Sequence, residues 1–102
     1  MDNTKFNSFK EFYPFYLSEH SKRLTKILHM IGSILVIYIL LYSINNQDWS
    51  KLYYLPVTGY GFAWTGHFFF EKNKPATFKY PLYSFIGDWI MLKDIIIGKV
   101  KL

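Results

Sequence analysis

Two long stretches without a charged residue constrain the fold of this chain more than any other feature. Residues 27–44 contain no Asp, Glu, Lys or Arg, and residues 52–70 repeat this pattern after a polar connector, residues 45–51. An α-helix rises about 1.5 Å per residue, so about 20 apolar residues can cross the hydrocarbon core of a bilayer. The pattern therefore predicts two membrane helices, 27–44 and 52–70, joined as a hairpin.

Small residues punctuate the second stretch. Pro56, Gly59, Gly61 and Gly66 all fall between residues 52 and 70. In water these residues weaken a helix, whereas in a membrane small residues let neighbouring helices approach closely. Their presence favours close packing of the two predicted helices.

The basic residues orient the predicted hairpin. The connector holds only Lys51, which Asp48 offsets, while the other basic side chains flank the hairpin at Lys5, Lys10, Lys22, Arg23, Lys26, Lys72, Lys74, Lys79, Lys93, Lys99 and Lys101. Positive residues accumulate on the cytoplasmic side of membrane proteins. We expect an integral protein of a bacterial inner membrane or the endoplasmic reticulum, with both termini in the cytoplasm.

Composition narrows the class of protein. The 102 residues form one predicted domain, 1–102, of which 51% are hydrophobic and 22% aromatic. The chain has no cysteine, which excludes disulfides and thiolate metal sites. A net charge of +5 suits anionic lipid headgroups or nucleic acid. Because the aromatic residues are concentrated in uncharged runs, no nucleic-acid partner is expected.

The segments on either side of the hairpin are amphipathic. In segment 1–26, aromatic residues at helical spacing predict a short cytoplasmic helix that ends before Pro14 or is interrupted there: Phe6, Phe9, Tyr13 and Tyr16. This helix would lie on lipid headgroups or pack on its own protein. Segment 80–98 predicts a second helix, with Pro81 in its first turn. It carries Asp88, Lys93 and Asp94, so it is interfacial, packed on the hairpin or a third crossing.

The predicted fold class is accordingly all-α, an integral membrane helical hairpin with amphipathic or interfacial helices at both ends. Ser18 and Ser21 are the candidate N-caps of its first long helix.

The hairpin brings the histidines to one depth. His29 and His67 stand equally far from Asp48 in the connector, on opposite sides of it, and His20 lies just before the first helix. Antiparallel helices therefore place all three imidazoles in one layer at the cytoplasmic face. Glu71 follows His67 by four residues, which puts both side chains on one face of a continuous helix.

Three imidazoles and a carboxylate suit a divalent metal such as Fe(II), Zn or Mn. We predict His20, His29 and His67 as metal ligands, with Glu71 and Asp88 as candidate catalytic residues. For each there is an alternative: a histidine at a membrane boundary can simply be amphipathic, Glu71 can pair with Lys72 or Lys74 in water, and Asp88 can be an interfacial charge.

Two motifs resemble a known family. Phe12-Tyr-Pro-Phe-Tyr16, followed by His20 and His29, and the block Gly66-His-Phe-Phe-Phe-Glu-Lys-Asn-Lys-Pro-Ala76 are similar to the membrane family that includes the fungal endoplasmic-reticulum 2-hydroxy fatty acid dioxygenase. That enzyme takes part in degrading phytosphingosine to odd-numbered fatty acids. The resemblance covers about Phe9 to Pro81.

The resemblance implies an Fe(II)-dependent α-oxidation. Dioxygen and a 2-hydroxy fatty acid, or a related lipid, would react at a histidine-bound iron, the C1–C2 bond would break, and the chain would shorten by one carbon. Carried over by position, the three histidines would be iron ligands or their close neighbours, and Glu71 would support them. Lys72, Lys74 and Arg23 would meet the carboxylate headgroup of the substrate.

The chain also departs from the family pattern. Longer members have further hydrophobic segments and an Asp-His pair between the motifs, and Ser33 stands where a proline often follows the His-x-x-Gly element. The alternative function is a non-catalytic membrane scaffold or lipid-binding subunit. Because two helices offer little surface to enclose a substrate, we also expect homo-oligomers.

Overall fold

The computed structural model describes residues 6–102, and every regular element within them is helical. The α-helices are α1 (Phe9–Ser18), α2 (Arg23–Asn45), α3 (Tyr54–Thr65) and α4 (Pro81–Ile96). The shorter elements are the 3₁₀ turns Trp49–Tyr53 and Ala76–Phe78 and the π-helical turn Gly66–Glu71. The all-α prediction is confirmed for this range, and the first five residues of segment 1–26 lie outside it.

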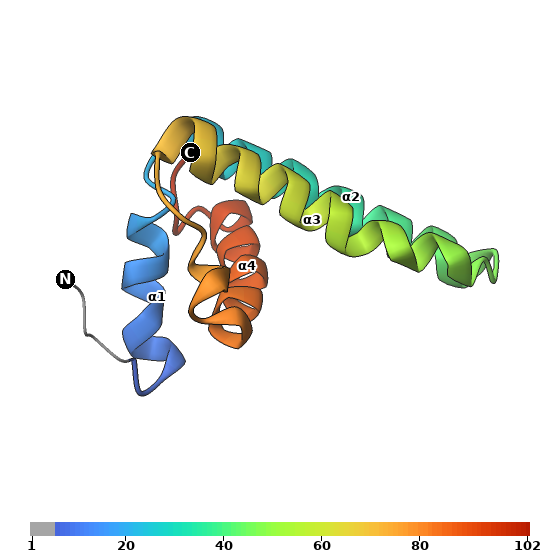
Figure 1. The fold of residues 1–102 in the computed structure, drawn as a ribbon, viewed down its shortest axis with the longest axis horizontal. Coiled ribbons are helices and arrows are strands. Elements are labelled where there is room, and N and C mark those ends of the chain that lie inside the picture. The colour runs from blue at the N-terminus through green and yellow to red at the C-terminus, as the bar shows by residue number, and fades with distance from the viewer. Residues whose placement is uncertain (1–5) are drawn as a thin grey trace.

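Helices α2 and α3 form a long antiparallel hairpin, while α1 and α4 gather at one of its ends (Figure 1). We call the end with α1 and α4 the base, and the part of the hairpin beyond them the arm. The arm ends in the turn between α2 and Trp49–Tyr53. The chain is elongated, with extents of 46 × 25 × 25 Å.

Only α2, of the helices described, is long and apolar enough to cross a membrane, with a mean hydropathy of 2.2 over its most apolar part. The second predicted span, 52–70, is divided among a 3₁₀ turn, α3 and the π-helical turn. Pro56 contributes to this division, because proline is accommodated most readily in the first turn of a helix and α3 begins two residues before it. The hairpin is thus observed as an arrangement of helices, and its insertion into a membrane stays a prediction.

Glycine allows the two helices of the hairpin to approach each other. A β-carbon added at Gly32 of α2 would lie 2.7 Å from the Cβ atom of Phe62, and one added at Gly66 would lie 3.0 Å from Thr25. Both distances are shorter than ordinary van der Waals contact. The expectation of close packing holds at Gly66, whereas Gly61 faces open space.

The compact core lies at the base, where α1 packs on α4. Phe12, Tyr16, Ala76 and Met91 are buried there, with further aromatic rings around them. Of the two alternatives for segment 1–26, packing on its own protein is the one observed. Pro14 lies inside α1, which continues without a break to Ser18, so the prediction of an end before Pro14 or an interruption there was wrong. The buried side chains of Phe12 and Tyr16 anchor the helix on both sides of the proline.

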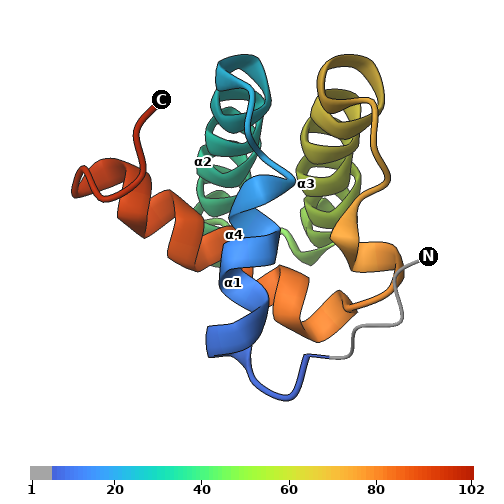
Figure 2. The ribbon, with the colours of Figure 1, turned by 90° about the vertical axis from the view of Figure 1, so that its left-hand side faces the viewer.

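Helix α4 crosses the base of the hairpin instead of running alongside it (Figure 2). It starts with Pro81 in its first turn, as predicted, and contacts both α1 and α2. Its buried side includes Ser84, Gly87 and Met91. The observed arrangement is therefore the packed alternative for segment 80–98.

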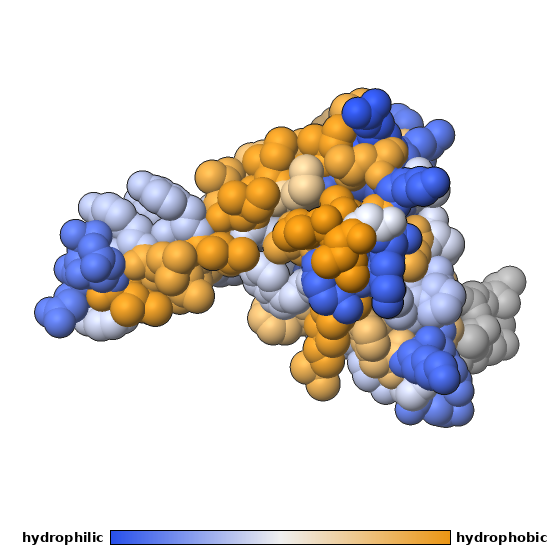
Figure 3. Space-filling model, turned by 180° about the vertical axis from the view of Figure 1, so that it is seen from behind, coloured by the Kyte–Doolittle hydropathy of each residue, from blue (hydrophilic) through white to orange (hydrophobic). Residues whose placement is uncertain are grey.

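Large apolar side chains remain exposed along the arm. Among them are Ile34, Leu41, Tyr53 and Val57. Figure 3 shows hydrophobic residues over the middle of the molecule and hydrophilic ones at the tip of the arm and at the base. An apolar band bounded by polar ends is the surface expected of a membrane protein.

Candidate metal centre

The three histidines meet at the base, between the end of α1, the first turns of α2 and the π-helical turn. His20 Nε2 lies 3.1 Å from His67 Nε2, and the ring centroids of His20 and His29 are 5.7 Å apart. Their exposed fractions are only 2%, 4% and 3% for His20, His29 and His67. Three imidazoles from separate parts of the chain are thus brought together away from solvent.

Local backbone geometry positions His67. It stands in the π-helical turn, an element that occurs frequently at functional sites. Lys72 ends this turn with a φ of 60°, and the Asn73 amide then donates to the His67 carbonyl at 3.0 Å. The same turn brings the Asn73 side chain to the imidazole, with Oδ1 2.8 Å from His67 Nδ1.

Hydrogen bonds define which ring nitrogens carry protons. The Tyr16 carbonyl can only accept, so His20 Nδ1, 2.7 Å away, is the donor. Asn73 Nδ2 donates to the Glu19 carbonyl at 3.3 Å, which leaves Asn73 Oδ1 to accept from His67 Nδ1. In the neutral rings, both Nε2 atoms therefore carry lone pairs.

Two lone pairs that face each other across 3.1 Å need a positive charge between or beside them. Burial lowers the pKa of His20 to about 3, and the neighbouring rings of His67 and His29 act in the same direction, so a proton on His20 is disfavoured. Imidazole nitrogens bind divalent metals at about 2.1 Å, and two such ligands at right angles lie about 3 Å apart. The His20–His67 pair fits two positions of one metal ion.

The third imidazole is oriented differently. His29 Nε2 donates to the Asp88 backbone carbonyl at 3.0 Å, and His29 Nδ1 lies 3.9 Å from Asp88 Oδ1. Across residues 6–102, no three His, Asp or Glu side chains converge closely enough to hold a metal ion as they stand. Two predicted ligands thus face each other, while His29 turns its nitrogens to Asp88.

Asp88 links α4 to the other elements of the site. Its Oδ1 atom accepts a hydrogen bond from the Tyr16 hydroxyl, and its backbone carbonyl holds His29. Burial raises the pKa of Asp88, although His29 and the Tyr16 hydrogen bond oppose this rise. Asp88 therefore positions His29 through its backbone carbonyl and Tyr16 through its carboxylate.

Glu71, the last residue of the π-helical turn, lies next to the start of α2. It accepts hydrogen bonds from the Ser21 hydroxyl at 2.8 Å and from the Lys22 backbone amide. Although partial burial works to raise the pKa of Glu71, these hydrogen bonds outweigh it and hold the pKa below its ordinary value. A carboxylate beside free amides and the positive end of a helix dipole stabilises that helix. Glu71 thus joins the end of the π-helical turn to α2.

This contact corrects the predicted caps of α2. The Ser21 hydroxyl donates its hydrogen bond to Glu71, and the Ser18 hydroxyl donates to the Phe15 carbonyl at 2.6 Å within α1. The N-cap residue of α2 is Lys22, which has no side-chain capping bond. The cap comes instead from Glu71, which lies about 50 residues further along the chain, so no local pattern around residue 20 could reveal it.

The predicted headgroup residues are exposed at the base. Arg23 is the first residue of α2, Lys72 ends the π-helical turn and Lys74 follows it. All three are exposed to solvent. Their role toward a substrate stays a prediction.

Sequence reasoning missed Tyr16 and Asn73 as parts of the site. Tyr16 is part of the predicted amphipathic face and of the Phe12–Tyr16 motif, but neither pattern indicates that its ring packs on His20 with centroids 4.3 Å apart or that its hydroxyl donates to Asp88. Asn73 was given no role, although it belongs to the Gly66–Ala76 block. Two signals were available for it: this motif, and its place just after a helix end, where Asn commonly stands in a turn.

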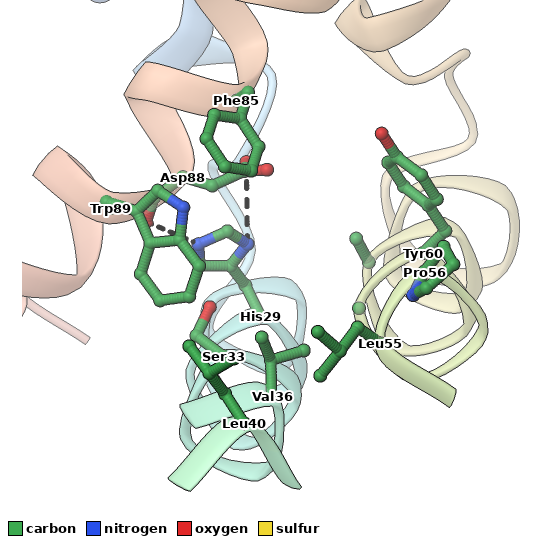
Figure 4. Close-up of a pocket in the computed structure, with 12 residues that line it drawn as sticks. His29, Ser33, Val36, Leu40, Leu55, Pro56, Tyr60, Phe85, Asp88 and Trp89 are labelled. Atoms are coloured by element: carbon green, nitrogen blue, oxygen red, sulfur yellow. Dashed lines mark hydrogen bonds and ion pairs between the residues drawn. The ribbon is translucent and has the colours of Figure 1, made fainter. Parts of the chain in front are cut away.

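An apolar groove of about 350 Å³ adjoins His29 and Asp88 (Figure 4). It lies between α2 and α3, and Phe85 and Trp89 of α4 line it near His29. Apart from His29, Ser33 and Asp88, its lining consists of aliphatic side chains, one glycine and the aromatic rings of Tyr60, Phe85 and Trp89. A small polar end on an apolar groove is typical of a ligand site.

Comparison with known proteins is consistent with the resemblance found in the motifs. Residues 6–100 match the family model described as 2-hydroxy-palmitic acid dioxygenase Mpo1-like. No curated protein and no solved structure gives a match. The matched range includes all three histidines, Glu71, Asn73 and Asp88. The chain therefore belongs to the 2-hydroxy-palmitic acid dioxygenase Mpo1-like family.

Proposed function

We propose that this protein is a membrane-bound, Fe(II)-dependent dioxygenase that shortens 2-hydroxy fatty acids by one carbon, with dioxygen as co-substrate. The observation that carries the proposal is the buried His20–His67 pair, whose Nε2 lone pairs face each other 3.1 Å apart. The family name supplies the substrate class. The apolar groove beside His29 supplies a place for an aliphatic chain.

The residues of the chain have separate tasks in this proposal. His20 and His67 would hold the iron through Nε2, and the Tyr16 carbonyl and Asn73 side chain fix both rings through Nδ1. Hydrogen bonds of this kind orient metal ligands and raise their basicity. Bound iron would supply dioxygen activation. His29, held by Asp88, would complete the site from the groove side, and burial of all three rings excludes water.

The surface of the arm supports the proposal that the arm inserts into a membrane. Helix α2 has the composition of a span and the arm exposes large apolar side chains. With the tip of the arm across the bilayer, both termini lie in the cytoplasm, by the excess of basic residues at the base. Lys72, Lys74 and Arg23 then stand where the carboxylate of a fatty acid in the bilayer would be. The exposed arm also offers a surface for self-association.

Iron content and oxygen consumption test the proposal. Protein purified without chelator and reloaded with Fe(II) under anaerobic conditions is expected to bind about one iron per chain and to consume oxygen with 2-hydroxypalmitate. His20→Ala and His67→Ala should lose both properties. Ser43→Ala, which removes a buried polar group from the arm, is the control and should keep both. Wild-type protein that binds no iron and leaves the substrate intact would refute the proposal.

One observation favours the alternative, a non-catalytic lipid-binding subunit: in residues 6–102 no third side chain converges with His20 and His67. That function predicts lipid binding without iron and no effect of His67→Ala beyond stability. The same iron measurement separates the two functions.

A further inference from the structure

The groove beside His29 is elongated along the hairpin. On α2 it is lined by His29, Ser33, Val36 and Leu40, which recur every three or four residues and so share one face of the helix. From His29 to Leu40 the helix rises about 16 Å. On α3, Leu55 lines the groove near the tip of the arm, and Ala63 lines it near the base.

The two ends of the groove differ in chemistry. At the base stand His29 and Asp88, with the His20 ring centroid 5.7 Å from that of His29. Toward the tip the lining is Val36, Leu40 and Leu55 (Figure 4). A narrow apolar groove with one polar end beside the candidate metal centre fits an extended aliphatic chain whose functional group lies at the histidines.

Gly59 keeps the middle of the groove open. It lies on α3 opposite Val36, and a β-carbon added there would sit 3.5 Å from Val36 Cγ2, which is ordinary contact. Because Gly59 and Val36 both line the groove and such a β-carbon would contact Val36, a larger side chain at residue 59 would narrow the groove. Gly61, two residues further along the same helix, has nothing within 4 Å of such an atom and does not line the groove.

We propose that this groove binds the alkyl chain of the 2-hydroxy fatty acid and that Gly59 together with Val36 determines how long a chain it accepts. The inference rests on the proposed function for the identity of the ligand. It adds the position of the chain, its direction from His29 toward Leu55, and the residues that limit its length.

Chain-length preference in binding tests the inference. Wild-type protein in lipid nanodiscs is titrated with 2-hydroxyoctanoate, 2-hydroxydodecanoate and 2-hydroxypalmitate in competition with a fluorescent fatty acid. Each methylene group buried in the groove contributes about 0.8 kcal/mol to the free energy of binding. Exclusion of only two methylene groups therefore weakens binding about tenfold or more. Gly59→Leu should weaken binding of 2-hydroxypalmitate at least about tenfold and leave 2-hydroxyoctanoate within about twofold of wild type.

Gly61→Leu is the matched control. It introduces the same side chain in the same helix outside the groove, and it should bind all three acids as wild type does. Val36→Phe narrows the groove from α2 and should reproduce the selective loss, which keeps the test decisive if Gly59→Leu does not fold. Equal effects of Gly59→Leu and Gly61→Leu, a uniform loss for all chain lengths, or wild-type binding without preference for length would overturn the inference.

The result separates this inference from the proposed function. Binding needs neither turnover nor dioxygen, so a wild type that binds longer chains better but consumes no oxygen leaves the groove assignment intact and refutes the oxidation. A wild type that oxidises 2-hydroxypalmitate, with Gly59→Leu keeping the same length preference, refutes the groove and leaves the oxidation intact.

Discussion

The base buries a cluster of apolar side chains, whereas the arm leaves most of its large apolar side chains exposed. At the base, His20, His29 and His67 are buried together, and hydrogen bonds reach them from Tyr16, Asn73 and Asp88. Along the arm, leucine, isoleucine and tyrosine side chains are exposed, while Ser43 is fully buried and bonds within its own helix. Burial of apolar surface therefore stabilises the base, and the arm leaves most of its apolar surface uncovered.

This difference indicates that the two regions are built for different surroundings. In water, exposed apolar surface is unfavourable by about 25 cal/mol per Å², whereas lipid removes that cost. The base resembles a small soluble core, because aromatic rings pack around the buried side chains of Phe12, Tyr16 and Met91. Substitutions at matched positions in the base and the arm should thus differ in their effects on metal affinity, stability or substrate binding.

Alanine substitutions at Asn73 and Asn46 should give the largest contrast between base and arm, which is a difference in metal affinity. Asn73→Ala removes the acceptor of His67 Nδ1, and loss of such a partner typically lowers metal affinity by about 10–100-fold. Asn46→Ala removes an amide that donates to the Tyr42 carbonyl in the arm, and it should leave metal affinity unchanged. Iron titration of both variants measures the effect. Equal affinities would mean that Asn73 has no role at a metal centre.

Gly32 and Gly61 compare a packed position with an open one. Gly32→Ala places a methyl group 2.7 Å from Phe62 Cβ, and overpacking of this kind should destabilise the fold by about 1–2 kcal/mol. Gly61→Ala meets no neighbour and should be neutral or stabilising by up to about 1 kcal/mol, because alanine favours the helix. Thermal unfolding in detergent distinguishes them, and a stable Gly32→Ala would contradict the close approach of the helices.

Glu71 makes the stability of the base depend on pH. Because its folded pKa is below the ordinary value, its contribution is complete above the ordinary glutamate pKa and is lost as pH falls through the lowered folded pKa. Glu71→Gln should destabilise the protein by about 1 kcal/mol at neutral pH, as expected for loss of a helix cap. The difference from wild type should shrink in acid. Melting curves over a pH series check this, and a constant difference would contradict it.

Glycine substitutions at Lys72 and Gln47 should have the smallest effect on stability. They also test the headgroup prediction for Lys72. Both adopt positive φ, 60° at the base and 52° at the tip of the arm. Glycine relieves that strain at the expense of a more flexible unfolded chain, so Lys72→Gly and Gln47→Gly should each stabilise by less than about 1 kcal/mol. If Lys72 meets the substrate carboxylate, only Lys72→Gly should raise KM for 2-hydroxypalmitate. Equal KM values for the two variants would remove Lys72 from the headgroup site.

The sequence alone allowed prediction of the features that depend on spacing along the chain. The charge-free run at 27–44 falls within α2, and equal distances from Asp48 anticipated that His29 and His67 would lie at one end of the hairpin. Family membership followed from the Gly66–Ala76 block. These properties are set by helix geometry and by motif identity.

The missing features depend on contacts between distant residues. Glu71 binds the start of α2 and Asp88 holds His29, contacts that join residues 49 and 59 positions apart. The π-helical turn that aims His67 at His20 has no signature in Gly-His-Phe-Phe-Phe-Glu. Contacts between elements that are distant in the sequence decide these details, and the hydrophobic pattern does not encode such contacts.

The contact between Glu71 and α2 makes the hairpin a closed loop. Its helices are joined covalently by the turn at the tip and non-covalently by the carboxylate at the base. Because α2 and α3 are joined at both ends, a shift of α3 along its axis would also have to move the start of α2. His67 and His29 therefore keep a fixed relative height, and motion in the arm reaches them only as bending.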